Sequence, residues 1–300
     1  MEVAMAELAQ RFGARLRERY PLAALTSFRI GGPGDLVLEV EDEEELIAAL
    51  AVASRHEVPS FVLGAGTNLL VSDRGIRGLV IRLGQGFSTI NFDGVEVSAG
   101  AAARFSDLVY AALERGLGGL EYGEGIPGTV GGALIMNAGA FGGELAPVVT
   151  AVRGVTAAGQ PRRLSPAEVN FGYRHSLLPG GFIVSGVEMR LLPGDRAALL
   201  AKAAELRARR AARQPKELPN AGSVFKNPPG NFAGRLLEEC GLKGERIGDA
   251  AFSERHANFI VNLGQARAAD VRALIELARK RVEEQTGVRL EPEVRLVGEW

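Results

Sequence analysis

Two glycine-rich segments of the chain have residue types typical of loops that bind phosphate groups. One is Gly64-Ala65-Gly66-Thr67-Asn68, which follows a predicted strand, and the other spans residues 123–133. Glycine lets consecutive main-chain N–H groups converge on an anion, since no Cβ stands in the way. The first segment has neither the third glycine of a Rossmann fingerprint nor the Gly-Lys-Ser/Thr ending of a P-loop. For either segment alone, tight turns between packed elements are an equally good explanation. Both together, each with a threonine beside a glycine, favour a long polyphosphate ligand such as a dinucleotide.

Three other side chains are candidates for chemistry. Ser223 follows two small residues that leave room for a ligand, although a serine after glycine is more often part of a turn or a helix cap. The guanidinium group of Arg174 suits a carboxylate, although most arginines are solvated surface residues. Glu293 is predicted to lie in a short strand near the end of the chain, either exposed or paired with Arg295.

Six short segments form an ordered set that extends from about residue 26 to residue 297. They are Ser27-Phe28-Arg29-Ile30-Gly31-Gly32, the loop 63–70, Ile126-Pro127-Gly128-Thr129-Val130-Gly131-Gly132, Phe171-Gly172-Tyr173-Arg174-His175-Ser176, Asn220-Ala221-Gly222-Ser223-Val224-Phe225-Lys226-Asn227-Pro228 and Leu290-Glu291-Pro292-Glu293-Val294-Arg295. In this order they resemble the segments of the UDP-N-acetylenolpyruvoylglucosamine reductases, and the resemblance covers nearly the whole chain.

The resemblance implies an α+β fold with two kinds of domain. One is a two-lobed FAD-binding domain of the PCMH/vanillyl-alcohol-oxidase type, which is unlike the Rossmann fold, and the other is a smaller α+β substrate-binding domain. The expected boundaries are 1–84 for the first FAD-binding lobe, 85–196 for the second lobe and 197–300 for the substrate-binding domain.

The resemblance also implies an activity. Enzymes of this family use NADPH and a tightly bound FAD to reduce the enolpyruvyl ether of UDP-N-acetylglucosamine enolpyruvate to UDP-N-acetylmuramate. This is an early cytoplasmic step of bacterial peptidoglycan synthesis. We expect a monomer whose partner is a small UDP-sugar, with no nucleic-acid or membrane partner and no metal.

The resemblance further assigns roles to individual residues. Ser223 matches the proton donor, a weak acid that suits the strongly basic carbanion formed when an enol ether is reduced. Arg174 and Glu293 match residues that stabilise the enolic intermediate. The expected FAD-binding residues are Arg29, Gly31, Gly64, Ala65, Gly66, Thr67, Asn68, Gly125, Ile126, Pro127, Gly128, Thr129, Gly131 and Gly132. The expected substrate-binding residues are Tyr173, Gln214, Lys226, Asn227 and His256.

Two further expectations follow from this assignment. Gly66→Val should displace FAD by placing a side chain where the pyrophosphate passes. The chain also resembles the shorter branch of the family, because the 48 residues between Arg174 and Ser223, positions 175–222, contain no tyrosine. Some members of the family carry a tyrosine-bearing insertion there.

Three alternative functions use the same residues. Another flavoenzyme on the same scaffold, such as an alcohol or sugar oxidase, is usually longer and has no evident need for Ser223, Lys226 and Asn227 together. A hydrolase with Ser223 as nucleophile is disfavoured, because no Gly-x-Ser-x-Gly elbow surrounds this serine. A non-catalytic nucleotide-binding module would show no NADPH turnover.

Composition limits the classes of function further. The 35 Lys and Arg nearly balance the 36 Asp and Glu, which argues against a nucleic-acid or anionic-membrane surface. The single cysteine, Cys240, excludes an intramolecular disulfide, and three separated histidines offer no metal cluster. The first residues lack the features of a signal peptide, and no apolar stretch reaches about 18 residues, so a reducing, cytoplasmic setting is expected.

Strands and helices alternate along the chain, which predicts α/β or α+β layers that position these loops. Strands are predicted over 35–40, 59–63, 79–83, 94–100, 148–155, 182–191 and 294–297, and helices over 43–51, 105–113, 196–213 and 268–284. The Arg-rich helix 196–213 is expected to have a mainly solvated face. Cys240 is interpreted as an apolar residue at a helix end.

Overall fold

The computed structural model describes residues 1–300, which divide into two compact units. Unit 1 comprises residues 1–18, 36–65 and 78–209, and unit 2 comprises residues 19–35, 66–77 and 210–300. Neither unit is continuous in sequence, because the chain passes between them several times. The predicted division into three domains at residues 84/85 and 196/197 stays a prediction.

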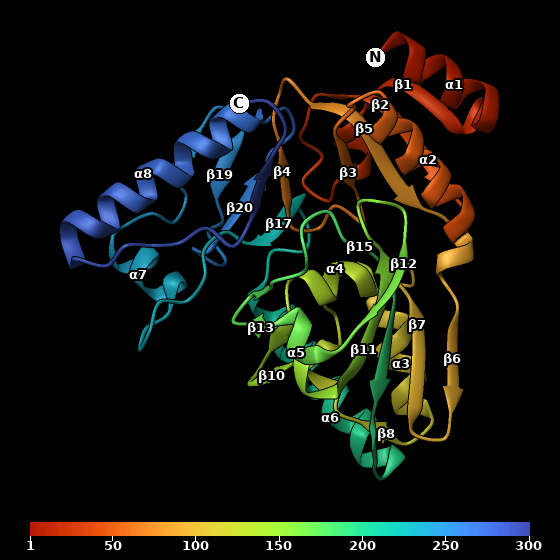
Figure 1. Ribbon diagram of the computed structural model, residues 1–300. Coiled ribbons are helices and arrows are strands. Elements are labelled where there is room, and N and C mark those ends of the chain that lie inside the picture. Colours follow the sequence, from red (N-terminus) through yellow and green to blue (C-terminus); the bar gives the residue numbers. More distant parts are fainter. The chain divides into compact units, whose positions relative to one another are not determined.

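The N-terminal part of unit 1 packs two helices with a four-stranded sheet of order β1-β2-β5-β3 (Figure 1). Its elements are α1 (Glu2–Phe12), β1 (Leu16–Pro21), β2 (Pro33–Val40), α2 (Glu43–Arg55), β3 (Ser60–Val62) and β5 (Ile76–Leu83). The helix α2 begins as the sequence predicts, since Asp42 Oδ1 accepts a hydrogen bond from Glu45 N at 2.8 Å. Leu8, Leu38 and Leu46 are fully buried in the core of this part.

The larger part of unit 1 is built on a five-stranded antiparallel sheet of order β12-β11-β15-β7-β6. Val187 in the central strand pairs with Val152 on one side and Ala99 on the other. The elements are β6 (Ile90–Asp93), β7 (Glu96–Gly100), α3 (Phe105–Glu114), β8 (Leu117–Gly118), α4 (Val130–Ile135), β9 (Gly139–Ala140), β10 (Gly143–Glu144), β11 (Val149–Val155), β12 (Pro161–Leu164), α5 (Pro166–Val169), β13 (Phe171–Gly172), β14 (His175–Ser176), β15 (Ile183–Arg190), β16 (Leu192–Pro193) and α6 (Arg196–Arg213).

The short helix α4 packs against β15 and β7, and through Ala203 the helix α6 contributes to the same core. Most of the α6 surface is exposed, because only Ala203 and Leu206 are buried in it. The prediction of a largely solvated Arg-rich helix over 196–213 is therefore confirmed.

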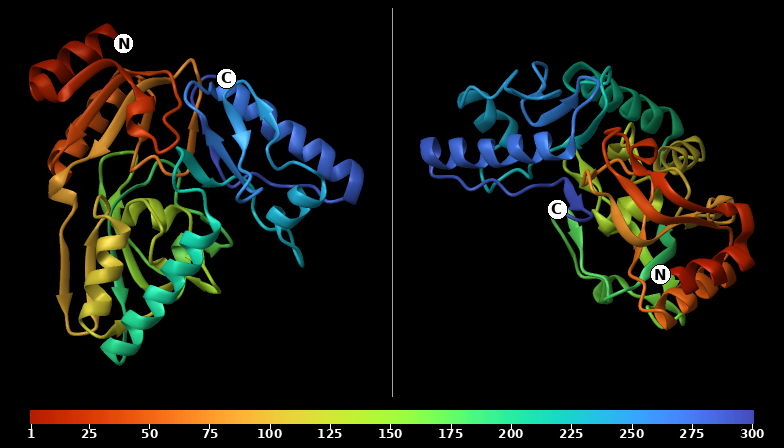
Figure 2. Two further views of the ribbon diagram at one scale, coloured as in Figure 1. Left: turned by 180° about the vertical axis from the view of Figure 1, so that it is seen from behind. Right: turned by 90° about the horizontal axis from the view of Figure 1, so that it is seen from above.

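Unit 2 contains a second core around a four-stranded sheet of order β17-β20-β19-β18. Its elements are β4 (Leu69–Val71), β17 (Asn220–Ser223), α7 (Ala233–Glu239), β18 (Arg246–Ile247), β19 (Ala250–Phe252), β20 (Phe259–Asn262), α8 (Ala268–Thr286) and β21 (Arg295–Val297). The long helix α8 packs along β19 and β18, and α7 packs on α8 (Figure 2). The first N–H groups of α8, those of Ala268 and Ala269, donate to the Asp73 carboxylate at 2.7 and 2.9 Å.

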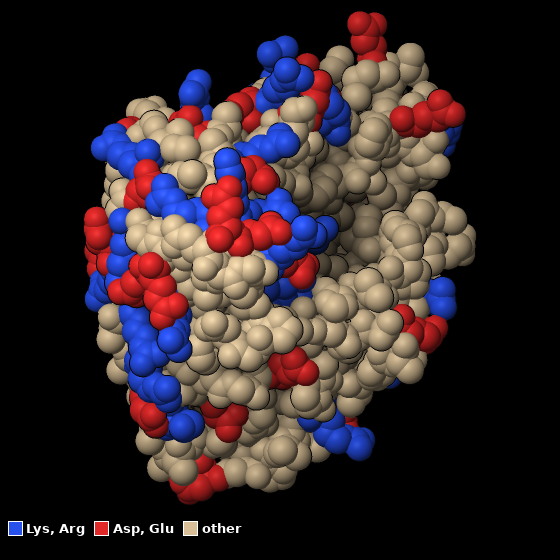
Figure 3. Space-filling model, turned by 90° about the vertical axis from the view of Figure 1, so that its left-hand side faces the viewer, with Lys and Arg blue, Asp and Glu red and all other residues tan.

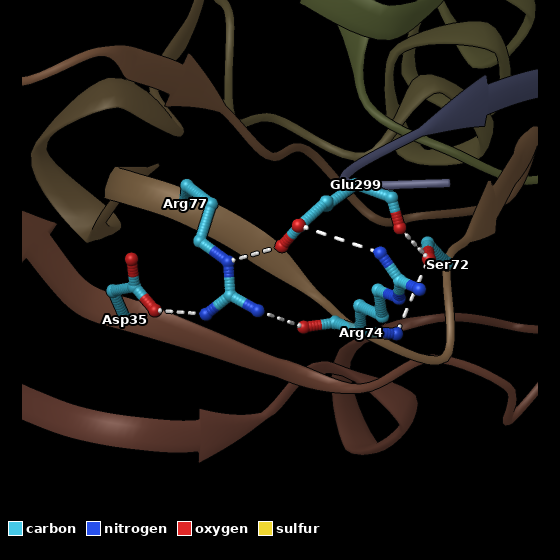
Figure 4. Close-up of polar contacts among 5 residues, drawn as sticks. All are labelled: Asp35, Ser72, Arg74, Arg77 and Glu299. Atoms are coloured by element: carbon cyan, nitrogen blue, oxygen red, sulfur yellow. Dashed lines mark hydrogen bonds and ion pairs between the residues drawn. The ribbon is translucent and has the colours of Figure 1, made fainter.

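The C-terminal segment of unit 2 is fixed to the chain that leaves the first glycine segment. Strand β21 pairs in parallel with β4, so that Leu296 lies opposite Leu70. Beyond this pair the Arg77 guanidinium donates to Glu299 Oε2 at 2.7 Å, to Asp35 Oδ1 at 2.8 Å and to Arg74 O at 2.9 Å (Figure 4). The segment of Asn68 and β4 is therefore held in unit 2 by its pairing with β21 and by the Arg77 contacts beyond it.

Most predicted elements are confirmed, with small shifts at their ends. Glu293 is an exception, because it lies two residues before β21 and not in a strand. Cys240 ends α7 and is buried, as interpreted.

Basic and acidic side chains are interspersed over the face seen in Figure 3, in line with the balanced composition. None of the helices combines the length and apolar character that crossing a bilayer requires.

Candidate active site

The first glycine segment offers a row of unused main-chain donors. The N–H groups of Gly64, Ala65, Gly66 and Thr67 make no hydrogen bond within the protein, and Gly64 and Ala65 are exposed. Consecutive free N–H groups of this kind suit a phosphate or pyrophosphate. The segment therefore fits the pyrophosphate of a dinucleotide such as FAD.

Within unit 1 the second glycine segment comes close to the first. Thr129 begins α4, and its Oγ1 accepts a hydrogen bond from Gly132 N at 3.2 Å. A Cβ placed on Gly64 would lie 3.0 Å from this same Oγ1, so the two loops are neighbours with little space between them. The main-chain N–H groups of Gly128 and Thr129 also make no hydrogen bond within the protein. The two loops therefore meet at Gly64 and Thr129.

Two of the expected cofactor residues, Gly131 and Gly132, already use their main-chain N–H groups within the protein. Gly131 N donates to Ala101 O at 2.9 Å, and Gly132 N donates to Thr129 Oγ1. A Cβ on Gly131 would lie 3.0 Å from Ala101 Cβ. Gly131 therefore allows close packing of α4 on Ala101. The roles of both glycines toward FAD stay predictions.

Gly66 is also required by the chain itself. Its φ is +62°, and a Cβ there would lie 2.4 Å from Leu25 O. Gly66 O accepts a hydrogen bond from Ser27 N at 3.2 Å, and Ser27 Oγ donates to Asn220 O at 2.7 Å. The displacement of FAD by Gly66→Val stays a prediction, and a side chain at this position would also collide with main chain at Leu25.

The expected cofactor residues Arg29 and Gly31 flank the same packed region. Both have positive φ, +55° for the exposed Arg29 and +138° for Gly31. A Cβ on Gly31 would lie 2.7 Å from Val71 Cβ, so this glycine allows close contact with β4. Gly125, Ile126 and Pro127 lie between η4 (Glu121–Gly123) and α4, where Gly125 and Pro127 are exposed.

In unit 2 the structure brings Ser223 and Glu293 to adjacent segments. Glu293 N donates to Val224 O at 2.7 Å, and the next residue pair, Phe225 and Pro292, forms a β-bridge. Ser223 ends β17 after an irregularity in its pairing with β20, where Gly222 has φ +77°. The bend leaves Ser223 partly exposed beside the strand.

Two asparagines fix these segments. Asn68 Nδ2 donates to Glu293 O at 3.0 Å, and Asn68 O accepts from Arg295 N at 3.0 Å. The buried Asn258 pairs with both main-chain groups of Phe225, accepting from its N at 2.9 Å and donating to its O at 2.8 Å. No local pattern in the sequence signals this amide bridge, because it joins segments 33 residues apart.

Lys226 and Asn227 follow Ser223 but already have partners. Lys226 Nζ lies 2.5 Å from Glu291 Oε1, a carboxylate with 70% of its surface exposed. Asn227 Oδ1 accepts from Ala233 N at 3.1 Å, which caps α7. The Lys226 side chain is mostly buried, and the pairing of its ammonium group with an exposed carboxylate is an interaction that a phosphate can replace.

Arg174 belongs to unit 1, where it stands with Tyr173 in the turn between β13 and β14. Its φ is +60°, and its guanidinium carbon lies 5.1 Å from the centre of the Tyr173 ring. A Cβ on Gly139 would lie 3.1 Å from Arg174 Nη1, so the guanidinium rests against the β9–β10 hairpin. Tyr173 is 48% exposed.

The remaining substrate candidates are Gln214 and His256. Gln214 directly follows α6, and its N donates to Arg210 O at 3.0 Å. His256 Nδ1 accepts from Asn258 N at 3.1 Å, and its ring meets the edge of Phe259. Burial lowers the pKa of His256, and the charges of Lys243 and Arg213 lower it further. No cluster of three or more His, Cys, Asp or Glu side chains is arranged to bind a metal.

Comparison with known proteins decides the family. A model of an FAD-binding domain matches residues 33–165, and a model of the C-terminal domain of UDP-N-acetylenolpyruvoylglucosamine reductase matches residues 214–297. UDP-N-acetylenolpyruvoylglucosamine reductase 2 of Symbiobacterium thermophilum is 52% identical over 95% of this chain and 92% of its own length. The chain belongs to the UDP-N-acetylenolpyruvoylglucosamine reductase family.

Further members of the UDP-N-acetylenolpyruvoylglucosamine reductase family agree. The protein of this name from Rubrobacter xylanophilus is 46% identical over 93% of this chain and 94% of its own length. The crystal structure of the Thermus caldophilus reductase matches with a TM-score of 0.83 and 44% identity, covering 94% of this chain and 99% of that one.

Family membership confirms the predicted α+β FAD-binding fold and the enzyme class. UDP-N-acetylenolpyruvoylglucosamine reductases are NADPH-dependent FAD reductases of peptidoglycan precursor synthesis, and this chain is an oxidoreductase of that kind. The hydrolase and the non-catalytic module are therefore excluded. The roles of single residues stay predictions.

Proposed function

We propose that the chain reduces the enolpyruvyl ether of UDP-N-acetylglucosamine enolpyruvate to UDP-N-acetylmuramate, with Ser223 as the proton donor. The name shared by the relatives supports the reaction. The observation that carries the assignment of residues is the 2.7 Å hydrogen bond from Glu293 N to Val224 O. It supports a shared site for the Ser223 hydroxyl and the Glu293 carboxyl, which come from distant parts of the sequence.

Main-chain N–H groups that have no hydrogen-bond partner within the protein support the assignment of the FAD-binding residues. The main-chain N–H groups of residues 64–67, 128 and 129 would hold the FAD pyrophosphate, with Asn68, Arg29, Gly31 and the stretch 125–127 beside it. When bound, FAD supplies the hydride, which it receives from NADPH.

The side chains of this protein have three tasks in the reaction. Arg174, which is always charged, binds the substrate carboxylate, where negative charge grows as the double bond is reduced. Glu293 stabilises the enolic form by hydrogen bonding. Ser223 donates its hydroxyl proton to that carbon, since the carbanion is basic enough to take it.

The UDP-sugar is held by the remaining candidates. Lys226 exchanges the exposed Glu291 carboxylate for a substrate phosphate, and Tyr173 offers a ring and a hydroxyl at the surface. Asn227, Gln214 and His256 complete the proposed set.

The test follows the two halves of the reaction separately. NADPH should bleach the flavin band of the Ser223→Ala holoenzyme at the wild-type rate. Return of the band on adding the UDP-sugar should slow by about 10²–10⁴-fold, because the proton donor is missing. Stopped-flow absorbance measures both rates.

Ser54→Ala serves as a matched control, because Ser54 is an exposed serine on α2 with no side-chain hydrogen bond. It should match the wild type in both halves. Normal reoxidation of Ser223→Ala by the UDP-sugar would refute the proton-donor role. A wild type that the UDP-sugar cannot reoxidise would refute the reaction itself.

We also propose that the enzyme works as a monomer in the cytoplasm. A nucleotide sugar and NADPH as substrates, together with a single buried cysteine, support this setting. Because the product enters peptidoglycan, loss of the activity should disturb cell shape and division. Light scattering behind a sizing column should give about the chain mass of 31.8 kDa, and twice that mass would contradict the monomer.

A further inference from the structure

The Asn137 side chain ties three segments of unit 1 together. This residue follows α4 and is 1% exposed. Its Nδ2 donates to Glu144 Oε2 at 3.1 Å and to Gly172 O at 3.1 Å, and its Oδ1 accepts from Ala146 N at 2.9 Å. The amide therefore uses both donors and its acceptor to link the end of α4, the β9–β10 hairpin and β13.

Two of the linked segments lie next to Arg174. Gly172 precedes the Tyr173–Arg174 turn and pairs with His175 across it, so the Gly172 carbonyl anchors the base of a two-residue turn. On the other side, a Cβ placed on Gly139 would lie 3.1 Å from Arg174 Nη1 and 3.1 Å from Glu144 Cβ. The guanidinium and Glu144 are therefore neighbours on the same hairpin.

The β9–β10 hairpin is held by a second contact besides the Asn137 side chain. Gly143 packs on the buried Tyr122 ring, since a Cβ there would lie 2.5 Å from Tyr122 Cδ1. The Asn137 amide also holds the Glu144 carboxylate, an anion that would otherwise compete for the cation beside it. One buried group thus sets both the base of the turn and the charge next to the guanidinium.

We infer that Asn137 is a positioning residue for Arg174 in the reaction with the enolpyruvyl substrate. The inference rests on the proposed function, in which Arg174 binds the substrate carboxylate. Asn137 touches no substrate in this account. It acts by keeping the Arg174 turn and the Glu144 carboxylate in place, and shifts of about 1 Å at such groups can cost about 10²-fold in rate.

Asn137→Gly tests the inference without straining the backbone. Asn137 has φ +39°, which glycine adopts freely, so only the amide is lost. We expect wild-type FAD content and wild-type reduction by NADPH, with reoxidation by the UDP-sugar slowed by about 10–100-fold. In an Arg174→Ala background, Asn137→Gly should add little, because the group that it positions is gone.

The matched control is Asn170→Gly. Asn170 also has a left-handed backbone, with φ +46°, and it lies two residues before Gly172, but it is exposed and its side chain makes no hydrogen bond. This variant should retain wild-type rates in both halves of the reaction. A slow Asn170→Gly enzyme would point to general loosening of the segment and overturn the inference.

Other outcomes are equally decisive. Equal slowing of both half-reactions by Asn137→Gly, or full additivity with Arg174→Ala, would overturn the positioning role. If Asn137→Gly does not fold, Asn137→Asp keeps the acceptor for Ala146 N and removes both donors, and it should show the same selective loss. Failure of both variants to fold would make Asn137 structural. If Arg174→Ala itself reacts normally, the proposed function has failed at Arg174.

Discussion

At the scale of single residues, glycines that look alike in the sequence serve different purposes. Gly66 is fixed by its positive φ and by main chain at Leu25, whereas Gly64 is exposed and faces only the Thr129 side chain. A side chain at Gly64 therefore disturbs the convergence of the two loops and little else. This distinction separates a test of cofactor binding from a test of folding.

Gly64→Ala should yield a folded protein that binds FAD less tightly. The added Cβ would crowd Thr129 Oγ1 at 3.0 Å and stand beside the unused N–H groups. Titration of apoprotein with FAD, followed by flavin fluorescence, measures the change in Kd. Gly180→Ala is the control, because Gly180 is exposed and a Cβ there meets nothing within 4 Å. Equal Kd values for the two variants would contradict the assignment of Gly64 to the cofactor.

At the scale of elements, the Ser223 segment depends on a partner from another strand. After β17 the main-chain N–H and C=O groups of Phe225 bond to a side chain and not to a neighbouring strand. The amide of Asn258, just before β20, makes both of these hydrogen bonds. Phe225 is itself buried. The local geometry of the proposed active site is therefore a property of two elements joined by one amide.

Asn258→Ala should lower the free energy of unfolding by about 1–3 kcal/mol, the usual cost of leaving buried polar groups without partners. Urea unfolding followed by circular dichroism measures this change. Asn91→Ala, at an exposed asparagine in β6 with no side-chain bond, should stay within about 0.5 kcal/mol of the wild type. An Asn258→Ala protein as stable as Asn91→Ala would show that water replaces the amide.

At the scale of the whole molecule, basic and acidic side chains nearly balance in number, and most of them lie at the surface. With a formal net charge of −1, overall repulsion contributes little to the pH dependence of stability near neutrality. Most ion pairs have exposed partners and contribute little each. The pH dependence of unfolding is therefore expected to depend on the few groups whose environment changes strongly on folding.

His256 is such a group. Its pKa is lowered in the folded protein, and burial is the largest cause. As the pH falls through the ordinary value of 6.5, His256 therefore binds a proton in the unfolded chain but stays neutral in the folded protein. The stability from neutral His256 is present above that pH and is lost as the pH falls below it. From about pH 7.5 to about pH 5.5, the wild type should lose more unfolding free energy than His256→Gln. Identical losses in urea unfolding would show that His256 does not titrate differently on folding.

The sequence alone determined the family-level features of this protein. Ordered motifs along nearly the whole chain carried the FAD-binding fold and the reductase activity, and local patterns such as Asp42 before Glu43–Glu45 predicted helices such as α2. These features depend on residues that are close in sequence. Propensity, capping and turn chemistry act over a few residues, so they can be recognised without a tertiary structure.

The tertiary structure decided which groups are free and which are already used. Only it showed that Gly131 and Gly132 donate inside the protein, that Gly66 meets main chain at Leu25, and that Asn137 and Asn258 bridge distant segments. A buried amide or a close main-chain contact depends on residues that folding brings together from far along the chain. No local pattern records such a contact, because its energy comes from partners that are absent until the chain has folded.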